Sequence, residues 1–341
     1  MHVDVPTTIL GFLQLFLTRE LLEFLVAETN AYADYMRYDM LRGDRGVWTP
    51  VTLGELARFL GMVVLMGFIP MPSTRMYWRR NKAYSMGNFA SLMSRDRFEA
   101  IRRNFHTFNR KAIPRGNRDR LIQVRPLMEY LLSRFGSTYQ PDCSVSLDEG
   151  LMPFKGRLSM KVYNPKKPHK YGVKLYMLCE SKSGYVINFI TYAGFSSSLR
   201  NIVFSLMEPY LNKGYHVYMD NFYNSVALAE ELYANGTHCS GTMRLTRGAP
   251  AVLKNLAKQR VPRNTMHCRR RGNVFVICWQ DIRLVTMVTT AMNAETEEFV
   301  HRRRSARGGQ STLEEAHLNR SQIIQAYCNY MGGVDLFDQM M

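Results

Sequence analysis

The sequence has few of the features that mark secreted, disulfide-stabilised or membrane-spanning proteins. Its six cysteines, at positions 143, 179, 239, 268, 278 and 328, include no C-x-x-C pair, so neither a disulfide framework nor a zinc module is indicated. The longest mainly apolar run, residues 59–72, is too short to cross a bilayer, and no signal-peptide pattern follows Met1. We therefore expect an intracellular, soluble protein with reduced cysteines and no membrane partner.

Acidic residues are scarce relative to basic ones. The 341 residues include 45 Lys and Arg against 28 Asp and Glu, a formal net charge of +17. A surplus of this size favours a polyanionic partner, nucleic acid first and an acidic membrane surface second. The basic residues do not gather on one amphipathic helix, which makes the membrane surface the less favoured partner. The chain is long enough for two domains or one large one with a substantial core.

The first third of the chain has the apolar spacing of helices. In TLGELARFLGMVVLMGF, residues 52–68, Thr52 and Glu55 predict a capping box ahead of a buried helix. The segment SRDRFEAIRRNFHTF predicts another helix from Ser94. A third helix is predicted in RLIQVRPLMEYLLSRFG, with Gly136 as its stop signal. This part is expected to be an α-rich unit.

The middle of the chain changes to short β-type runs bounded by Gly, Pro, Ser and Asn. These runs are SVSLDEGLMPF, KYGVKLYMLCES, GYVINFITYAG and YHVYMDNFYNS. In the first, Asp148 lies on the face opposite Val145 and Leu147, so it is predicted to leave the core side of its strand. Asp220 ends the last run, just before a predicted helix that Gly236 terminates.

The segment 248–313 is less regular and is interpreted as an insertion. It contains a predicted hairpin around Gln280 and Asp281, in NVFVICWQDIRLVTMVTT. It also contains two arginine triplets, at 269–271 and 302–304. The triplets either grip DNA or act as nuclear import signals, or they are solvated basic loops.

Three acidic residues stand out because of where they fall. Asp148 lies on one predicted strand, Asp220 ends another, and Asp335 follows a helical segment that Gly332 and Gly333 interrupt. Clustered carboxylates repel unless a cation neutralises them, and their hard oxygens suit Mg²⁺ or Mn²⁺. Two such ions can activate a water or hydroxyl and stabilise the leaving oxygen of a phosphodiester.

Each acid taken alone also has an ordinary structural explanation. Asp148 can pair with Lys155 or Arg157 at a strand end, and Asp220 can cap the turn that follows it. Asp335 with Asp338 also fits the acidic first turn of any helix. Only the combination of the acids favours a functional site.

The segments around these acids closely resemble piggyBac-type DDE transposases and their domesticated derivatives. In order along the chain they are SLDEGLMPFKGR, YNPKKPHKYGVKLYMLCES, MDNFYNS and NYMGGVDLFDQM, with similar segments also in the helical third. The resemblance implies that Asp148, Asp220 and Asp335 are the three catalytic, metal-binding aspartates. It implies that Asp338 is a further aspartate needed near the metal.

The resemblance also implies a fold and a domain order. The fold is α/β, with an RNase H-like catalytic core of a mixed sheet with helices, an N-terminal helical domain and an inserted β-containing domain. We expect a helical dimerisation and DNA-binding domain at 1–138, the first part of the core at 139–247, the insertion domain at 248–315 and the last helical core segment at 316–341. Because the family continues into a longer helix and a cysteine-rich zinc-binding domain, we expect this last segment to be truncated.

The function implied by the resemblance is DNA transposition in the nucleus. A homodimer would cleave and join phosphodiesters at TTAA sites and transposon ends of double-stranded DNA, with Mg²⁺ or alternatively Mn²⁺. One alternative is a domesticated or truncated, non-catalytic nuclear DNA-binding protein. Another is an unrelated nuclease with the same fold, since fold does not fix reaction.

Basic and aromatic residues beside the first strand have expected roles in DNA binding. The aromatic residues either stack on an unpaired base or belong to the core; they are Tyr163, Tyr171, Phe222 and Tyr223. The basic residues either contact DNA phosphates or form a solvated loop; they are Lys155, Arg157, Lys161, Lys166, Lys167, Lys170 and Lys174.

Overall fold

The structure is a computed structural model in which two compact units can be distinguished. The units comprise Met1–Arg134 and Phe135–Met341. The structure describes residues 5–39, 48–79, 89–165, 167, 169–194, 197–291, 296–307 and 310–340.

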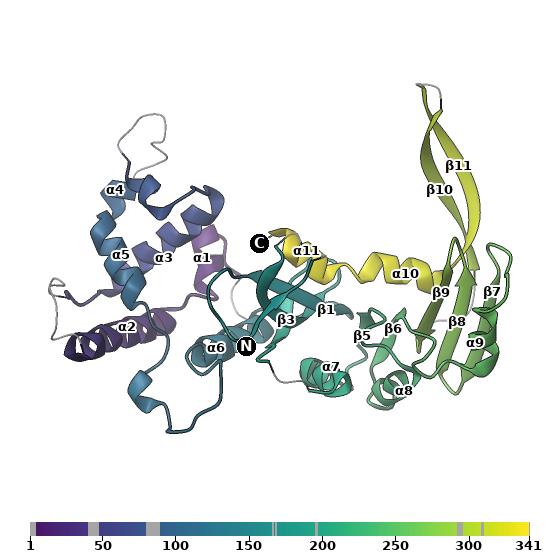
Figure 1. Cartoon of the computed structure of the whole chain (residues 1–341), viewed down its shortest axis with the longest axis horizontal. Coiled ribbons are helices and arrows are strands. Elements are labelled where there is room, and N and C mark those ends of the chain that lie inside the picture. Colours follow the sequence, from purple (N-terminus) through teal and green to yellow (C-terminus); the bar gives the residue numbers. More distant parts are fainter. Residues whose placement is uncertain are drawn as a thin grey trace. The chain divides into compact units, whose positions relative to one another are not determined.

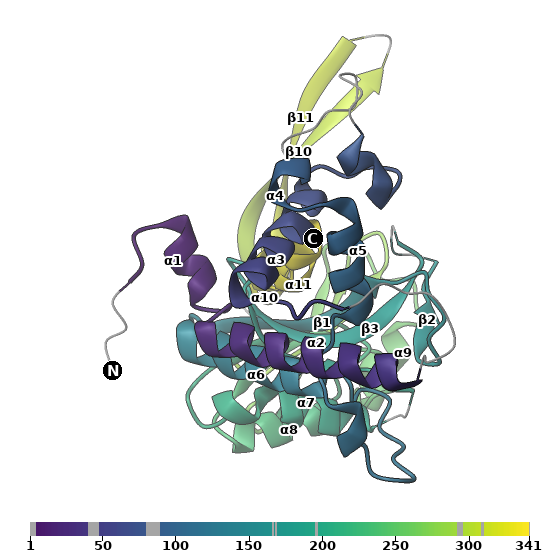
Figure 2. The same ribbon diagram turned by 90° about the vertical axis from the view of Figure 1, so that its left-hand side faces the viewer.

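The first unit is helical, as its apolar spacing predicts. Its helices are α1 (Ile9–Gln14), α2 (Arg19–Asp39), α3 (Leu53–Phe68), α4 (Phe89–Leu92), α5 (Arg95–Asn104) and most of α6 (Arg125–Thr138), with short 3₁₀ turns at Thr74–Trp78 and Arg110–Ala112. Helices α3 and α5 run across α2 (Figure 2). Their buried faces form one core around Leu25, Leu56, Phe59 and Phe98.

The predicted start of α3 is confirmed in detail. The Thr52 hydroxyl accepts a hydrogen bond from the Glu55 backbone N–H at 3.3 Å, and the Glu55 carboxylate accepts one from the Thr52 N–H at 3.2 Å. Helix α5 likewise begins after Ser94, whose hydroxyl accepts from the Arg97 N–H. Reciprocal capping satisfies backbone donors that the first helical turn leaves without partners.

The prediction that Gly136 ends its helix is wrong. Helix α6 continues through Gly136 to Thr138. Gly136 does not adopt the left-handed backbone that makes glycine a terminator. The helix instead ends shortly before Pro141, whose ring disfavours helical backbone in the residue before it.

The second unit is built on a mixed sheet, in which the described residues contribute nine strands in the order β2-β3-β1-β5-β6-β9-β8-β7, with β4 pairing to β3. Strand β1 is antiparallel to β3 and parallel to β5, and β5 is parallel to β6. The strands are β1 (Ser144–Pro153), β2 (Lys161–Tyr163), β3 (Tyr171–Glu180), β4 (Val186–Thr191), β5 (His216–Met219), β6 (His238–Thr242), β7 (Met266–Arg271), β8 (Val274–Gln280) and β9 (Leu284–Thr289). The four predicted β-type runs therefore form β1, β3, β4 and β5.

Helices cover both faces of this sheet (Figure 1). Helices α7 (Leu199–Met207) and α8 (Val226–Ala234) lie on one face, whereas α10 (Gln322–Tyr330) and α11 (Gly333–Met340) run along the other. A short 3₁₀ turn, Glu208–Tyr210, follows α7, and α9 (Ala251–Leu256) follows β6. Helix α8 ends before Gly236, which adopts a left-handed backbone as predicted.

Both faces of β1 are buried, and this fixes the surroundings of Asp148. Val145 and Leu147 belong to the large core beneath α7 and α8. The opposite face of the sheet carries a smaller cluster that includes Met177 and Val334 of α11. Asp148 pairs in register with Met177. It therefore lies on the α11 side of the strand, away from the large core as predicted.

The predicted hairpin around Gln280 and Asp281 is confirmed as β8 and β9, and β9 pairs with β6. The alternative that the arginine triplets form solvated loops is wrong. Residues 269–271 belong to β7, and residues 302–304 to β10 (Thr296–Arg307), which pairs with β11 (Gln310–Ser321) in a separate hairpin. Strand β7 lies at a sheet edge, where consecutive charged side chains are tolerated. The side chains of residues 302–304 lie outside the described ones.

Candidate active site between two strands and a helix

The parallel pairing of β1 and β5 places two of the predicted acids side by side. Leu147 and Met219 are partners in this pairing, so Asp148 and Asp220 are the next residue along each strand. Both side chains are half-buried. The Asp148 carboxylate accepts a hydrogen bond from the Glu149 N–H at 2.8 Å, and the Asp220 carboxylate accepts one from the Phe222 N–H at 2.8 Å. These bonds hold each carboxylate against its own backbone.

Burial and mutual repulsion change the acidity of both carboxyls. The pKa of Asp148 is raised to about 7, first by burial and then by the adjacent carboxylates of Glu149 and Asp220. The pKa of Asp220 is also raised, mainly by burial, with Glu149 adding to the effect. Two such groups lower their energy by taking up a proton or by binding a cation.

Helix α11 brings the third and fourth acids to the same side of β1. Its first residue, Gly333, lies so close to the strand that a Cβ there would collide with the Ser146 hydroxyl and lie 2.6 Å from the Glu180 carbonyl oxygen. Only glycine allows this approach. Asp335 is exposed and Asp338, nearly one turn later, is half-buried.

Asp338 is held by a lysine from a distant part of the chain. The Lys167 ammonium lies 2.6 Å from Asp338 Oδ2. The other oxygen, Oδ1, is buried and has no hydrogen-bond partner among the described residues. Burial alone lowers the pKa of Lys167, but Asp338, Asp335 and Asp148 outweigh it and the pKa is raised. Lys167 therefore lies in the field of carboxylates from both β1 and α11.

A second ion pair lies on the opposite side of β1. Glu149 Oε1 accepts from the Lys174 ammonium at 3.0 Å, and this ammonium also lies 4.6 Å from the ring centroid of Tyr176 and 5.1 Å from that of Phe222. Tyr223 is 1% exposed, and burial beside Glu149 raises the pKa of its hydroxyl. The sequence analysis did not include Glu149 among the site residues. The signal available was that it is an acidic residue directly after Asp148.

The donor set fits a divalent cation in its chemistry. The donors are hard carboxylate oxygens, two of the carboxyls have raised pKa values, and Asp338 Oδ1 is buried without a partner. Within the described ranges, no group of three or more His, Cys, Asp or Glu side chains is arranged to hold a metal ion. The acids lie in one region of the sheet, with Lys167 as the cation next to Asp338, but the described side chains do not surround a common metal position.

The predicted DNA-contacting residues divide into three groups. Lys155, Arg157 and Lys170 are exposed. Lys161 donates to the Gly156 carbonyl at 2.9 Å, and both Lys167 and Lys174 are in the ion pairs described above. Lys166 lies outside the described residues.

The aromatic residues expected to stack on a base differ in their exposure to solvent. Tyr163 and Tyr171 are exposed, with ring centroids 4.9 Å apart. Tyr223 belongs to the core.

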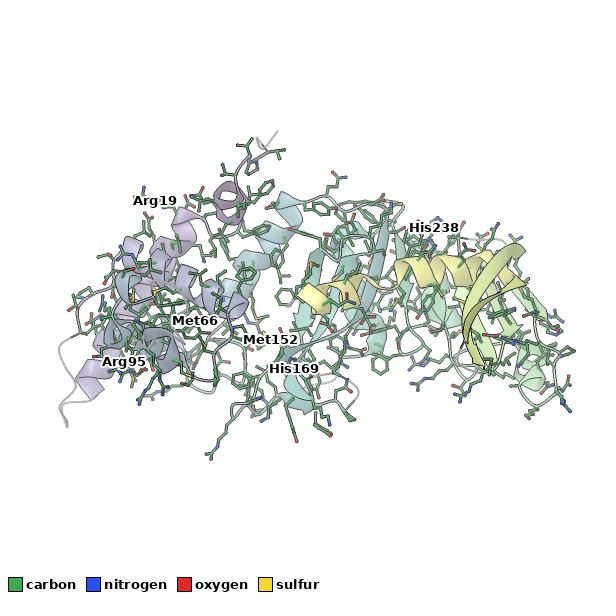
Figure 3. The ribbon with its side chains drawn as sticks, turned by 90° about the horizontal axis from the view of Figure 1, so that it is seen from above. Arg19, Met66, Arg95, Met152, His169 and His238 are labelled. Atoms are coloured by element: carbon green, nitrogen blue, oxygen red, sulfur yellow. The ribbon has the colours of Figure 1, made fainter. Side chains whose placement is uncertain are left out.

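Figure 3 shows Met152 of β1 and His169 of the β2–β3 turn at the same end of the unit, away from His238.

A family model described as Transposase IS4 matches residues 10–341. The chain belongs to this family. Transposases of the DDE type, to which the matched model refers, generally use divalent metal ions.

Within the described residues, no helix has both the length and the apolar character needed to cross a membrane.

Human relatives support a narrower grouping. The chain is 27% identical to PiggyBac transposable element-derived protein 3 of Homo sapiens, over 98% of this chain and 55% of that protein. It is 25% identical to the human PiggyBac transposable element-derived protein 2, over 96% of this chain and 55% of that protein. The chain thus spans about half the length of these relatives. It is a member of the piggyBac-like transposases and the proteins derived from them.

A solved structure confirms the fold. The chain is similar to a cryo-EM structure of a piggyBac transposase synaptic complex with hairpin DNA, with a TM-score of 0.78 and 24% sequence identity. The similarity covers 97% of this chain and 67% of the other. The predicted mixed α/β architecture is confirmed, and the sheet is consistent with an RNase H-like core.

Proposed function

We propose that this chain carries the catalytic core of a piggyBac-like DNA transposase. Asp148, Asp220, Asp335 and Asp338 would hold Mg²⁺, or alternatively Mn²⁺, for phosphodiester cleavage and strand transfer at TTAA sites. The observation that carries the proposal is that β1, β5 and α11 bring carboxylates from distant parts of the sequence to one region of the sheet.

The bound ions would supply the positive charge that stabilises the attacking and leaving oxygens of a phosphodiester. The contribution of the chain itself is to hold the carboxylates in fixed positions. Asp148 and Asp220 project from paired strands, and Asp220 is oriented by the Phe222 N–H. Lys174 pairs with Glu149 and so offsets part of the repulsion between this carboxylate and Asp148. Because these carboxylates are already held in place, less conformational entropy would be lost when a reacting phosphate is positioned.

The partner in this proposal is double-stranded DNA, with the chain acting as a homodimer in the nucleus. The net charge of +17 supports a polyanionic partner. The similar solved structure is itself a complex with hairpin DNA. The exposed Lys155, Arg157 and Lys170 would contact backbone phosphates, which fix position without reading sequence.

Cleavage and strand transfer on TTAA-flanked DNA test the proposal. With Mg²⁺ or Mn²⁺ we expect nicked and joined products from the intact chain, and a loss of at least a hundredfold in Asp220→Asn. Asp281→Asn is the matched control, because Asp281 pairs with Arg263 in the β8–β9 turn, away from β1 and α11. Products from Asp220→Asn at the wild-type level would refute the assignment of the catalytic acids.

A second candidate is a non-catalytic nuclear DNA-binding protein derived from a transposase. Two observations favour it: the human relatives are named as element-derived, and Asp338 is already neutralised by Lys167. This candidate predicts salt-sensitive DNA binding, equal in the wild type and Asp220→Asn, without nicked or joined products from either.

A further inference from the structure

Lys167 has an unusual position for a basic residue expected to face DNA. It comes from the turn between β2 and β3, yet its ammonium lies 2.6 Å from Asp338 Oδ2 on α11. The two side chains are only 25% and 22% exposed. An ion pair shielded to this degree is screened less by salt than a pair on the open surface.

The charges on the α11 side of β1 are not balanced without this lysine. Asp338, Asp335 and Asp148 all act on the Lys167 ammonium strongly enough to outweigh its burial. Within the described residues, no other ion pair involves Asp148, Asp220, Asp335 or Asp338. Glu149 has its own partner in Lys174. Among the described residues, Lys167 is therefore the one ion-pair partner of the carboxylate group that the proposed function assigns to divalent ions. Arg244 also favours the charged form of Asp220, without forming an ion pair with it.

We propose that Lys167 is an exchangeable counter-cation: it holds Asp338 until a divalent ion binds the carboxylates, and is then released toward a DNA phosphate. This inference rests on the proposed function. A divalent ion and an ammonium close to the same carboxylate repel one another, so binding of the ion weakens the Lys167 contact.

The structure provides both ends of this exchange. Asp338 Oδ1 is buried without a partner among the described residues, so the carboxylate has an oxygen free to accept an ion. Lys167 has a flexible four-carbon stem, and Lys170, three residues later in the same β2–β3 connection, is exposed. A displaced Lys167 ammonium would join the exposed basic residues expected to contact phosphates. Exchange would thus link ion binding to DNA binding.

The first test is a Mn²⁺ titration followed by thermal unfolding of the intact chain. In chelator, Lys167→Gln should melt at a lower temperature than the wild type, because Asp338 loses its partner. The Mn²⁺ concentration for half of the maximal stabilisation should fall at least threefold, because the ion no longer competes with an ammonium. Lys167→Arg, which keeps the charge, should restore both values toward the wild type.

Lys182→Gln is the matched control. It removes the same charge from the same unit, where Lys182 pairs with Asp142 on the surface. Its half-saturating Mn²⁺ concentration should equal that of the wild type. An unchanged or raised Mn²⁺ requirement in Lys167→Gln would overturn the exchange.

The second test measures the affinity for a TTAA-containing duplex with and without Ca²⁺, the ion used here as a probe of binding alone. The gain in affinity on adding Ca²⁺ should be several-fold in the wild type and in Lys182→Gln, and smaller in Lys167→Gln. An equal gain in all three proteins would overturn the release of Lys167 to phosphate.

Failure of this inference can be told apart from failure of the proposed function. If Mn²⁺ stabilises the wild type, Asp148→Asn abolishes that effect and Lys167→Gln behaves as the wild type, the ion site stands and the exchange is wrong. If Mn²⁺ leaves the stability of the wild type unchanged up to about 10 mM, roughly tenfold above the dissociation constants of the weakest carboxylate sites, both proposals are wrong.

Discussion

At the scale of single residues, Asp148 shows how the fold changes ordinary side-chain chemistry. The same carboxyl in an unfolded chain has a pKa of about 3.9. Burial between the sheet and α11, beside Glu149 and Asp220, raises this pKa to about 7. The native chain therefore binds a proton at pH values where the unfolded chain has already released it.

This difference predicts a pH-dependent effect of Asp148→Asn in chelator. Because the folded pKa is the higher one, the stability from protonated Asp148 is complete below about pH 4 and is lost as the pH rises through about 7. Asparagine does not titrate. The variant should gain stability over the wild type between pH 5 and pH 8, by on the order of 2 kcal/mol. Urea unfolding across this range measures the difference, and a constant difference would contradict the raised pKa.

The sequence predicted part of this site, and the residues show why only part. Strand alternation was enough to place Asp148 opposite Val145 and Leu147, and a strand end was enough to place Asp220. The Lys167–Asp338 pair joins residues 171 positions apart. The Lys174–Glu149 pair depends on the register of β1 with β3. Neither geometry is encoded in a local pattern.

At the scale of elements, the contact of α11 with β1 decides whether the four acids share one region. Gly333 permits this contact, and Val334 packs beside Met177 and Cys179 on the sheet. Gly332 and Gly333 both precede the acids of α11 in the sequence, and the structure assigns them different roles. Gly333 touches the strand, whereas nothing lies within 4 Å of a Cβ at Gly332.

These roles predict opposite outcomes for two neighbouring substitutions. Gly333→Ala should destabilise the chain by roughly 1–3 kcal/mol, because its Cβ meets Ser146 and the Glu180 backbone. Gly332→Ala should change stability by less than about 0.5 kcal/mol, or raise it slightly by restricting the unfolded chain. Urea unfolding compares the two variants. Equal effects would show that α11 does not rest on β1 as described.

Other elements mark the limits of sequence patterns. The capping box of Thr52 and Glu55 specified the start of α3 through local hydrogen bonds, and such signals were reliable. Gly136 was misinterpreted because a glycine stops a helix only when its backbone turns left-handed, which the neighbouring structure decides. The β10–β11 hairpin was missed because its sequence lacks a clear alternation of apolar and polar residues.

At the scale of the whole molecule, the net charge of +17 leads us to expect that electrostatics supplies most of the proposed affinity for DNA. The division into a core at 139–247 and 316–341 and an insertion at 248–315 stays a prediction. Strands β7 to β9 continue the same sheet as β1 and β5. The sequence could not show this continuity, because the pairing of β6 with β9 joins segments about 50 residues apart.

The salt dependence of DNA binding tests the expected phosphate contacts. In the double variant Lys155→Gln and Arg157→Gln, the slope of log affinity against log salt should become shallower by about 2, since each phosphate contact contributes about 0.9. The control is Lys182→Gln with Lys213→Gln, which removes two exposed charges elsewhere in the same unit. A slope that changes equally in both double variants would mean that only total charge matters.

The central claim is that Asp148 and Asp220, from neighbouring strands, bind a divalent ion together with the acids of α11. Calorimetric titration of Mn²⁺ into the intact chain measures this binding without requiring DNA or turnover. The account predicts saturable binding in the wild type and in Asp281→Asn, and its loss in both Asp148→Asn and Asp220→Asn. Binding of equal strength in all four proteins, or none in the wild type, would contradict it.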